Sequence, residues 1–199
     1  MDLAILYQGH TEPVTLQEAK DFLAVDHDEH DSLISSLITA ARQRAENYCN
    51  QSFVEKRYVL ALDNYPRKGT IKLPRGPVRS IISVKYNNGT EEVTLSSNKY
   101  HLNNYASPAW ILFKEPFTPA DEPNSLKIQY ITGFDSVSYI ADGNEEPAFP
   151  FPEPVRTAIK MITRTMYDHR DDLVVGAAVN QIPKSSEYLL NDYRVFEFL

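Results

Sequence analysis

The densest cluster of side chains able to do chemistry is DHDEHD, residues 26–31. Histidine and carboxylates together can bind a divalent metal ion. The cluster lacks the sixth-position glycine and the distal glutamate of a calcium-binding loop, and its histidines do not stand four residues apart. Because a strong helical pattern follows, we interpret the cluster as the acidic start of a helix. There, carboxylates accept hydrogen bonds from the free N–H groups and interact favourably with the positive end of the helix dipole.

A second cluster, DHRDD at residues 168–172, contains an acid–base pair around His169. No residue is placed by spacing to orient this histidine, and no nucleophile motif accompanies it, so we interpret the cluster as a charged helix end. The nucleophile elbow, the phosphate-binding loop and the dinucleotide fingerprint are all missing from the sequence. The sequence therefore predicts no enzyme, and no catalytic, cofactor-binding or metal-binding residues.

The composition narrows the class of protein further. Of 199 residues, 42% are hydrophobic and 24% charged, as in globular proteins. The formal net charge of -7 argues against tight binding of nucleic acid, although an acidic surface suits DNA passing close by. No apolar run reaches bilayer length, no signal peptide is expected at the N-terminus, and the only cysteine, Cys49, is predicted to be a packed apolar residue in an intracellular protein.

Helical patterns lie towards the two ends of the chain. Thr15 and Glu18 have the spacing of a capping box and predict a short helix over 15–24. A longer helix should start near Asp28, with one apolar and one polar face. The predicted apolar face comprises Leu33, Ile34, Leu37, Ile38, Ala41, Ala45 and Tyr48. The predicted polar face comprises Ser35, Ser36, Arg42, Gln43, Glu46 and Asn47.

Strand patterns fill the middle of the chain. Alternating apolar residues or turn signals predict strands at 54–62, 70–73, 78–86, 91–95, 100–102, 110–113 and 126–133. In the third of these, Val78, Ile82, Val84 and Tyr86 share one parity and should face the same side. Asn87-Asn88-Gly89 indicates a hairpin turn, and Ser107-Pro108 a second one. These strands favour a compact antiparallel sheet or small barrel.

The last third of the chain begins with a long loop at 135–152, rich in Pro, Gly, Asp and Glu. A helix should follow from Pro152 to about 168–172, and a shorter one over 185–193. The chain ends in VFEFL, which can either pack on its own domain or dock on a partner, for example by adding a strand to a sheet edge.

The order of the segments resembles a known family. They are TLQEAKDFLAVD (15–26), LISSLITAAR (33–42), AENY (45–48), IKLPRGPVRSI (71–81), IQYITGF (128–134), PEPVRTAI (152–159) and LLNDYRV (189–195). In this order they resemble the head–tail connector, or head-completion adaptor, proteins of tailed bacteriophages. The resemblance covers about residues 13–195.

The resemblance implies a fold, a role and a set of partners. The fold would be α+β: mainly a helical bundle, with an N-terminal helix pair and a C-terminal helix, carrying a small antiparallel β-sheet or barrel-like insertion. The whole of 1–199 would be a single connector domain: helical over 13–52, β-rich over 53–134, a loop over 135–152, a helix over 153–172, and a C-terminal helix and tail over 173–199.

In function, it would be a structural virion protein at the head–tail junction, made in the host bacterial cytoplasm. It would form a homo-oligomeric ring, typically a dodecamer, although the isolated chain can be monomeric. Its partners would be the portal protein and the downstream neck or tail-completion protein, with DNA nearby in the channel and with no cofactor and no membrane.

Two surfaces are predicted to make these contacts. The polar side of the third helix and its charged end would meet neighbouring subunits, and the C-terminal segment would dock on the portal. The candidate interface residues are Arg156, Lys160, Arg164, Asp168, Arg170, Asp171, Tyr193, Val195, Phe196, Phe198 and Leu199. Two alternatives remain open: a non-viral β-containing module that binds protein or carbohydrate, and a small metal-dependent hydrolase using residues 26–31.

Overall fold

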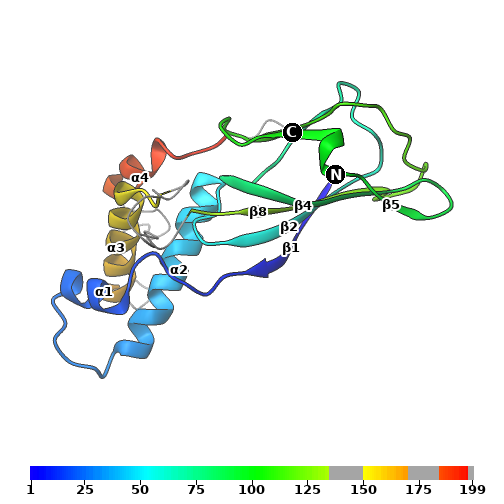
Figure 1. Ribbon diagram of the computed structural model, residues 1–199. Coiled ribbons are helices and arrows are strands. Elements are labelled where there is room, and N and C mark those ends of the chain that lie inside the picture. The colour runs from blue at the N-terminus through cyan, green and yellow to red at the C-terminus, as the bar shows by residue number, and fades with distance from the viewer. Residues whose placement is uncertain (135–149, 170–183, 197–199) are drawn as a thin grey trace, which may run out of the picture. The chain divides into compact units, whose positions relative to one another are not determined.

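The computed structural model describes residues 1–134, 150–169 and 184–196. Within these ranges the chain forms four α-helices and eight β-strands (Figure 1). They divide into two compact units. We call residues 1–10 and 54–134 the β unit, and the described residues of 11–53 and 150–196 the helical unit.

The β unit consists of two antiparallel sheets. One sheet has the strand order β1-β2-β8-β4-β5, and the other has the order β3-β7-β6. The strands of the first sheet are β1 (Asp2–Gln8), β2 (Lys56–Leu62), β4 (Val78–Asn87), β5 (Glu92–Thr94) and β8 (Leu126–Thr132). Those of the second are β3 (Thr70–Lys72), β6 (Tyr100–Asn103) and β7 (Trp110–Phe113), and a 3₁₀ turn, Ser97–Lys99, precedes β6.

Alternate side chains of both sheets form one apolar core. Leu60 on β2, Ile128 on β8 and Ile111 on β7 are all fully buried in it. The period of two along each strand produces this arrangement, since every second side chain points to the same face. The remaining core residues are Tyr58, Ile71, Leu73, Val78, Val84, Ala109, Phe113, Leu126 and Tyr130.

The helical unit contains α1 (Leu16–Leu23), α2 (Asp31–Cys49), α3 (Glu153–Asp168) and α4 (Lys184–Asn191). The predicted capping box is confirmed: the Thr15 hydroxyl accepts from the Glu18 N–H, and the Glu18 carboxylate accepts from the Thr15 N–H. Four members of the predicted apolar face of α2 are buried, and α3 buries a matching set. These residues are Ile34, Ile38, Ala41 and Ala45 on α2, and Val155, Ala158, Ile159 and Ile162 on α3.

The prediction of a mainly helical bundle is wrong. Helices and strands occupy similar shares of the described residues, 32% and 28%. The strands are not a small insertion, because two facing sheets enclose a core of twelve buried residues of their own. The β-strands between 56 and 132 therefore form a unit with its own hydrophobic core rather than an attachment to a bundle.

Three local predictions also fail. Ile82 is 45% exposed rather than inward-facing, because the β4–β8 register shifts between Ile81 and Ser83 and moves it to the outer face. Arg42 and Glu46 are buried, although their charge suggested a solvated helix face. β1 was not predicted at all, and it pairs antiparallel with β2 along its whole length.

Candidate assembly surfaces

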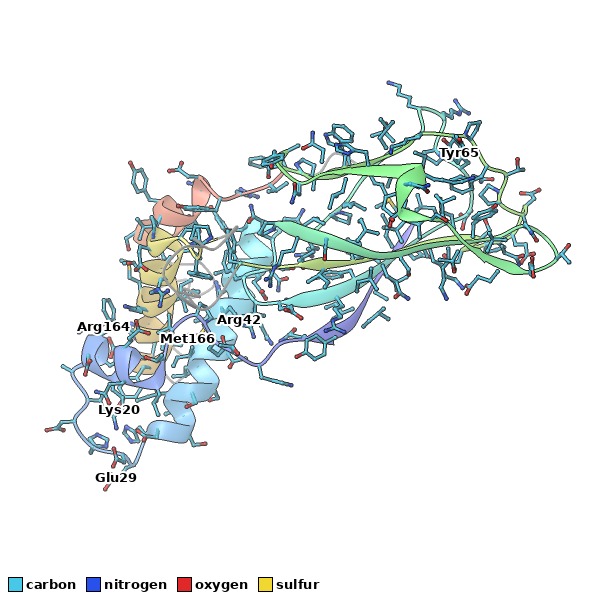
Figure 2. All side chains as sticks on the ribbon, viewed as in Figure 1. Lys20, Glu29, Arg42, Tyr65, Arg164 and Met166 are labelled. Carbon is cyan, nitrogen blue, oxygen red and sulfur yellow. The ribbon has the colours of Figure 1, made fainter. Side chains whose placement is uncertain are left out.

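Two carboxylates of the cluster at residues 26–31 form ion pairs with Lys20 of α1. Lys20 Nζ lies 2.6 Å from an Asp28 carboxylate oxygen and 2.8 Å from one of Asp31. The hydrogen bond to Asp28 raises the pKa of Lys20 and lowers that of Asp28. Glu29 is exposed and lies apart from Lys20 (Figure 2). Among the described residues, no group of three His, Cys, Asp or Glu could hold a metal ion.

Cys49 is a packed side chain. It is fully buried, and its thiol donates to the Leu190 carbonyl at 3.6 Å. Burial raises the pKa of this thiol to about 12, so it stays protonated and unreactive at neutral pH. The prediction of a packed apolar residue is confirmed.

The predicted interface on α3 is partly engaged within its own unit. The Arg156 guanidinium lies 3.5 Å from a Glu18 carboxylate oxygen and 3.1 Å from one of Glu153, and its side chain is only 22% exposed. It also lies over the Phe151 ring, 5.5 Å from the centroid. Arg156 therefore ties α3 to α1, and little of it remains to meet a neighbour.

The C-terminal end of α3 is more open. Arg164 and Asp168 form an exposed pair at 3.5 Å, with 55% and 51% of their side chains accessible. Figure 2 shows Arg164 on the helix surface. Lys160 is half-buried on the same helix. Arg170 and Asp171, predicted to continue this surface, lie outside the described residues.

The C-terminal segment packs on its own unit as far as Val195. The Val195 N–H donates to the Cys49 carbonyl at 2.9 Å, and Gln51 Nε2 donates to the Tyr193 carbonyl at 2.7 Å. Beyond Val195, the Phe196 ring is 63% exposed. The Arg194 guanidinium lies 4.8 Å from its centroid. Phe198 and Leu199, the remaining predicted contacts, lie outside the described residues.

A surface that sequence reasoning missed is strand β1. It is the outer strand of the five-stranded sheet, and its first six residues are exposed. Leu3 and Ile5 pair with Leu60 and Tyr58, two core residues of β2. Side chains directly opposite each other in an antiparallel pair point to the same face. The core-facing side of the sheet therefore continues onto β1, where Leu3 is 38% and Ile5 54% exposed.

No helix in the described parts of the chain combines the length and the apolar character needed to span a membrane. Among the described residues, three surfaces are exposed: the β1 edge, the C-terminal end of α3, and the segment around Phe196.

Comparison with known proteins identifies the family. A model of the phage gp6-like head-tail connector protein matches residues 13–115, just over half of the chain. A search of curated proteins gives no match. Among solved structures, the fold is similar to chains in the neck of an empty gene transfer agent particle with C6 symmetry (16% identity, TM-score 0.74) and of a native one with C12 symmetry (17%, 0.75).

Each of these two alignments covers 100% of this chain and 98% of the other chain. A third similar chain, from the virion of the native particle, has 17% sequence identity, a TM-score of 0.75 and the same coverage. At such identities the likeness is one of fold. It includes residues 1–12, which precede the family match, so β1 belongs to the shared fold. The match over 13–115 decides between the connector and the two alternative functions: the chain belongs to the family of phage gp6-like head-tail connector proteins, which are structural components of the virion.

Proposed function

We propose that this connector assembles as a ring at the head–tail junction, with the portal on one side and the next neck or tail component on the other. The observation that carries the proposal is the match to a connector family, together with a fold shared over the full chain with subunits of C6- and C12-symmetric necks. Neither catalysis nor a cofactor is part of this role.

The charge of the chain fits a ring around DNA. DNA must slide through such a channel without being held, and a net charge of -7 disfavours long-lived contacts with phosphates. In a closed ring, one face of each subunit meets a different face of its neighbour. On α3, Arg164 and Asp168 are available for such a contact, whereas Arg156 is only 22% exposed and already forms ion pairs with Glu18 and Glu153.

For the portal contact we propose the segment from Tyr193 to Leu199. Its first residues are fixed to the end of α2, and Phe196 extends from this anchor with an exposed ring. Aromatic side chains that are exposed in the free protein and flanked by Arg are frequent anchors at protein interfaces.

The test is electron microscopy of the full chain mixed with the portal of the virus that encodes it. We expect a ring at one end of the portal. The absence of a ring at every protein ratio tested would contradict the proposal. Removal of residues 196–199 should abolish portal binding while leaving the bonds of Tyr193 and Val195 intact. Tyr188→Ala is the control, because Tyr188 is another aromatic residue of the helical unit, 78% exposed.

A further inference from the structure

We propose that β1 is a subunit–subunit contact, at which a second copy of this chain covers both the strand's free edge and its exposed apolar side chains. This inference rests on the ring proposed above and specifies one of its contacts. It concerns residues 1–8, which precede the segment that matches the connector family.

The first argument is the state of the edge. A strand at the border of a sheet presents N–H and C=O groups that can pair with another chain, and proteins usually protect such edges with charge, proline or very short strands. β1 has seven residues, DLAILYQ, with one charged residue and no proline. A register shift between Ile5 and Tyr7 is its only irregularity, and it leaves Asp2–Ile5 in regular pairing with β2.

The opposite border of the same sheet shows what protection looks like. β5 has three residues, and its Glu92 pairs with Lys85 at 3.1 Å and with Lys127 at 3.4 Å. This border is short and charged, as expected for an edge that stays in water. The β5 edge therefore has the features of an edge that stays in water, whereas the longer, mostly apolar β1 edge has those of an edge that another chain covers.

The second argument is the uncovered apolar face. Leu3 and Ile5 continue the face that carries the buried Leu60 and Tyr58. On β2, β8 and β4 this face packs into the common core, whereas on β1 Leu3 is 38% and Ile5 54% exposed. A partner that supplied apolar side chains at this place would extend an existing core, which is a favourable way to bury area.

The chemistry of β1 selects the partner. DNA is disfavoured because the strand carries Asp2 and has no Lys or Arg to neutralise a phosphate. An apolar edge of this kind is an aggregation hazard when it stays in water, so the assembled particle should cover it on every copy of the subunit. A second copy of the chain meets this condition, and a heterologous ring gives the edge a different surface of its neighbour to bind.

The test compares two isoleucines of one sheet. Ile5→Lys places a charge on the proposed contact, and Ile82→Lys places one on β4, where the side chain is similarly exposed at 45%. Both full-length variants should remain folded by circular dichroism. With the portal present, we expect Ile5→Lys to raise the concentration required for ring formation roughly tenfold or more, and Ile82→Lys to leave it unchanged.

A photo-crosslinking residue at position 5 identifies the occupant. In rings built from mixed ¹⁴N- and ¹⁵N-labelled chains, we expect crosslinked peptides that combine both labels. Equal ring formation by the two lysine variants, or crosslinks only to the portal or another neck protein, would overturn the inference while leaving the ring intact. If the wild-type chain forms no ring, the proposed function fails first, and this inference falls with it.

Discussion

The two compact units are stabilised in different ways. The β unit has an apolar core, and its ion pair between Lys85 and Glu92 lies in water. The helical unit contains a buried charge network, because Arg42 is 1% exposed and bonds to both Glu12 and Glu46.

This network orders the chain as well as stabilising it. Glu12 precedes α1, and the Phe53 N–H, which follows α2, donates to Glu46 at 2.7 Å. Arg42 lies on α2 (Figure 2) and donates to the carboxylates of both Glu12 and Glu46. Apolar burial is not directional, whereas charged hydrogen bonds fix geometry. The helical unit therefore adds a few directional contacts to the apolar packing of α2 and α3, whereas the core of the β unit is apolar.

The largest effect should come from Arg42→Met. The substitution removes the Arg42 hydrogen bonds to the carboxylate of Glu12 and the buried carboxylate of Glu46, and breaking a buried ion pair in this way costs about 3–5 kcal/mol of unfolding free energy. Lys85→Met, in the exposed pair of the β unit, should cost at most about 1 kcal/mol. Urea unfolding measures both values, and amide hydrogen exchange should show protection lost first in α2. Equal costs for the two variants would remove the contrast between the units.

In the β unit, Gly133→Ala should cause a comparably large loss of unfolding free energy. Gly133 directly follows β8 with φ of +109°, and an added Cβ would clash with the Val54 carbonyl group. The positive φ and the backbone clash together should cost about 3 kcal/mol. Gly89→Ala is the matched control, since its φ is +92° but its nearest neighbour would be 4.0 Å away, so about 1 kcal/mol is expected. Thermal unfolding compares them, and similar losses would show that φ, not the clash, matters.

A smaller effect should follow from Thr15→Ala, which removes the hydroxyl of the capping box and should cost about 1 kcal/mol. Acid sensitivity should persist in this variant, because the Thr15 N–H, which remains, is the main cause of the lowered pKa of Glu18. Because the pKa of Glu18 is lower in the folded state, its carboxylate stabilises the fold at pH values above the ordinary glutamate pKa of about 4.3. This stabilisation is lost as the pH falls through the folded-state pKa. Glu18→Gln should therefore flatten the stability profile below that pH, and an unchanged acid slope would contradict this assignment.

Features encoded in neighbouring residues could be predicted from the sequence. The Thr15–Glu18 capping box, the apolar stripes of α2 and α3, and the hairpin at Asn87–Gly89 each lie within a few residues, and the structure contains all of them. Features that depend on distant partners could not. Arg42 resembles a solvated residue until Glu12, thirty positions earlier, is seen to bind it.

The sequence did not predict β1 for a different reason. A strand exposed on both faces has no alternation of polar and apolar residues, so Leu3, Ala4, Ile5 and Leu6 carry no signal of period two. The unbroken apolar run at residues 3–6 was the one feature of the sequence that pointed to a contact surface here. The same lack of pattern that hid the strand is what makes it a candidate contact.

The smallest effect on stability should come from exchanging the exposed charges of α3. Arg164→Ala should cost about 0.3–0.5 kcal/mol, as for other exposed pairs one helical turn apart. The double variant Arg164→Asp, Asp168→Arg retains a pair and places the cation nearer the C-terminal end of the helix, so its stability should match the wild type. It nevertheless reverses the charges that a neighbouring subunit would meet. If α3 contributes to the ring contact, ring formation should weaken while the unfolding midpoint stays constant, and the salt dependence of assembly should change with it. Normal assembly by the exchanged variant would restrict the role of this pair to the helix itself.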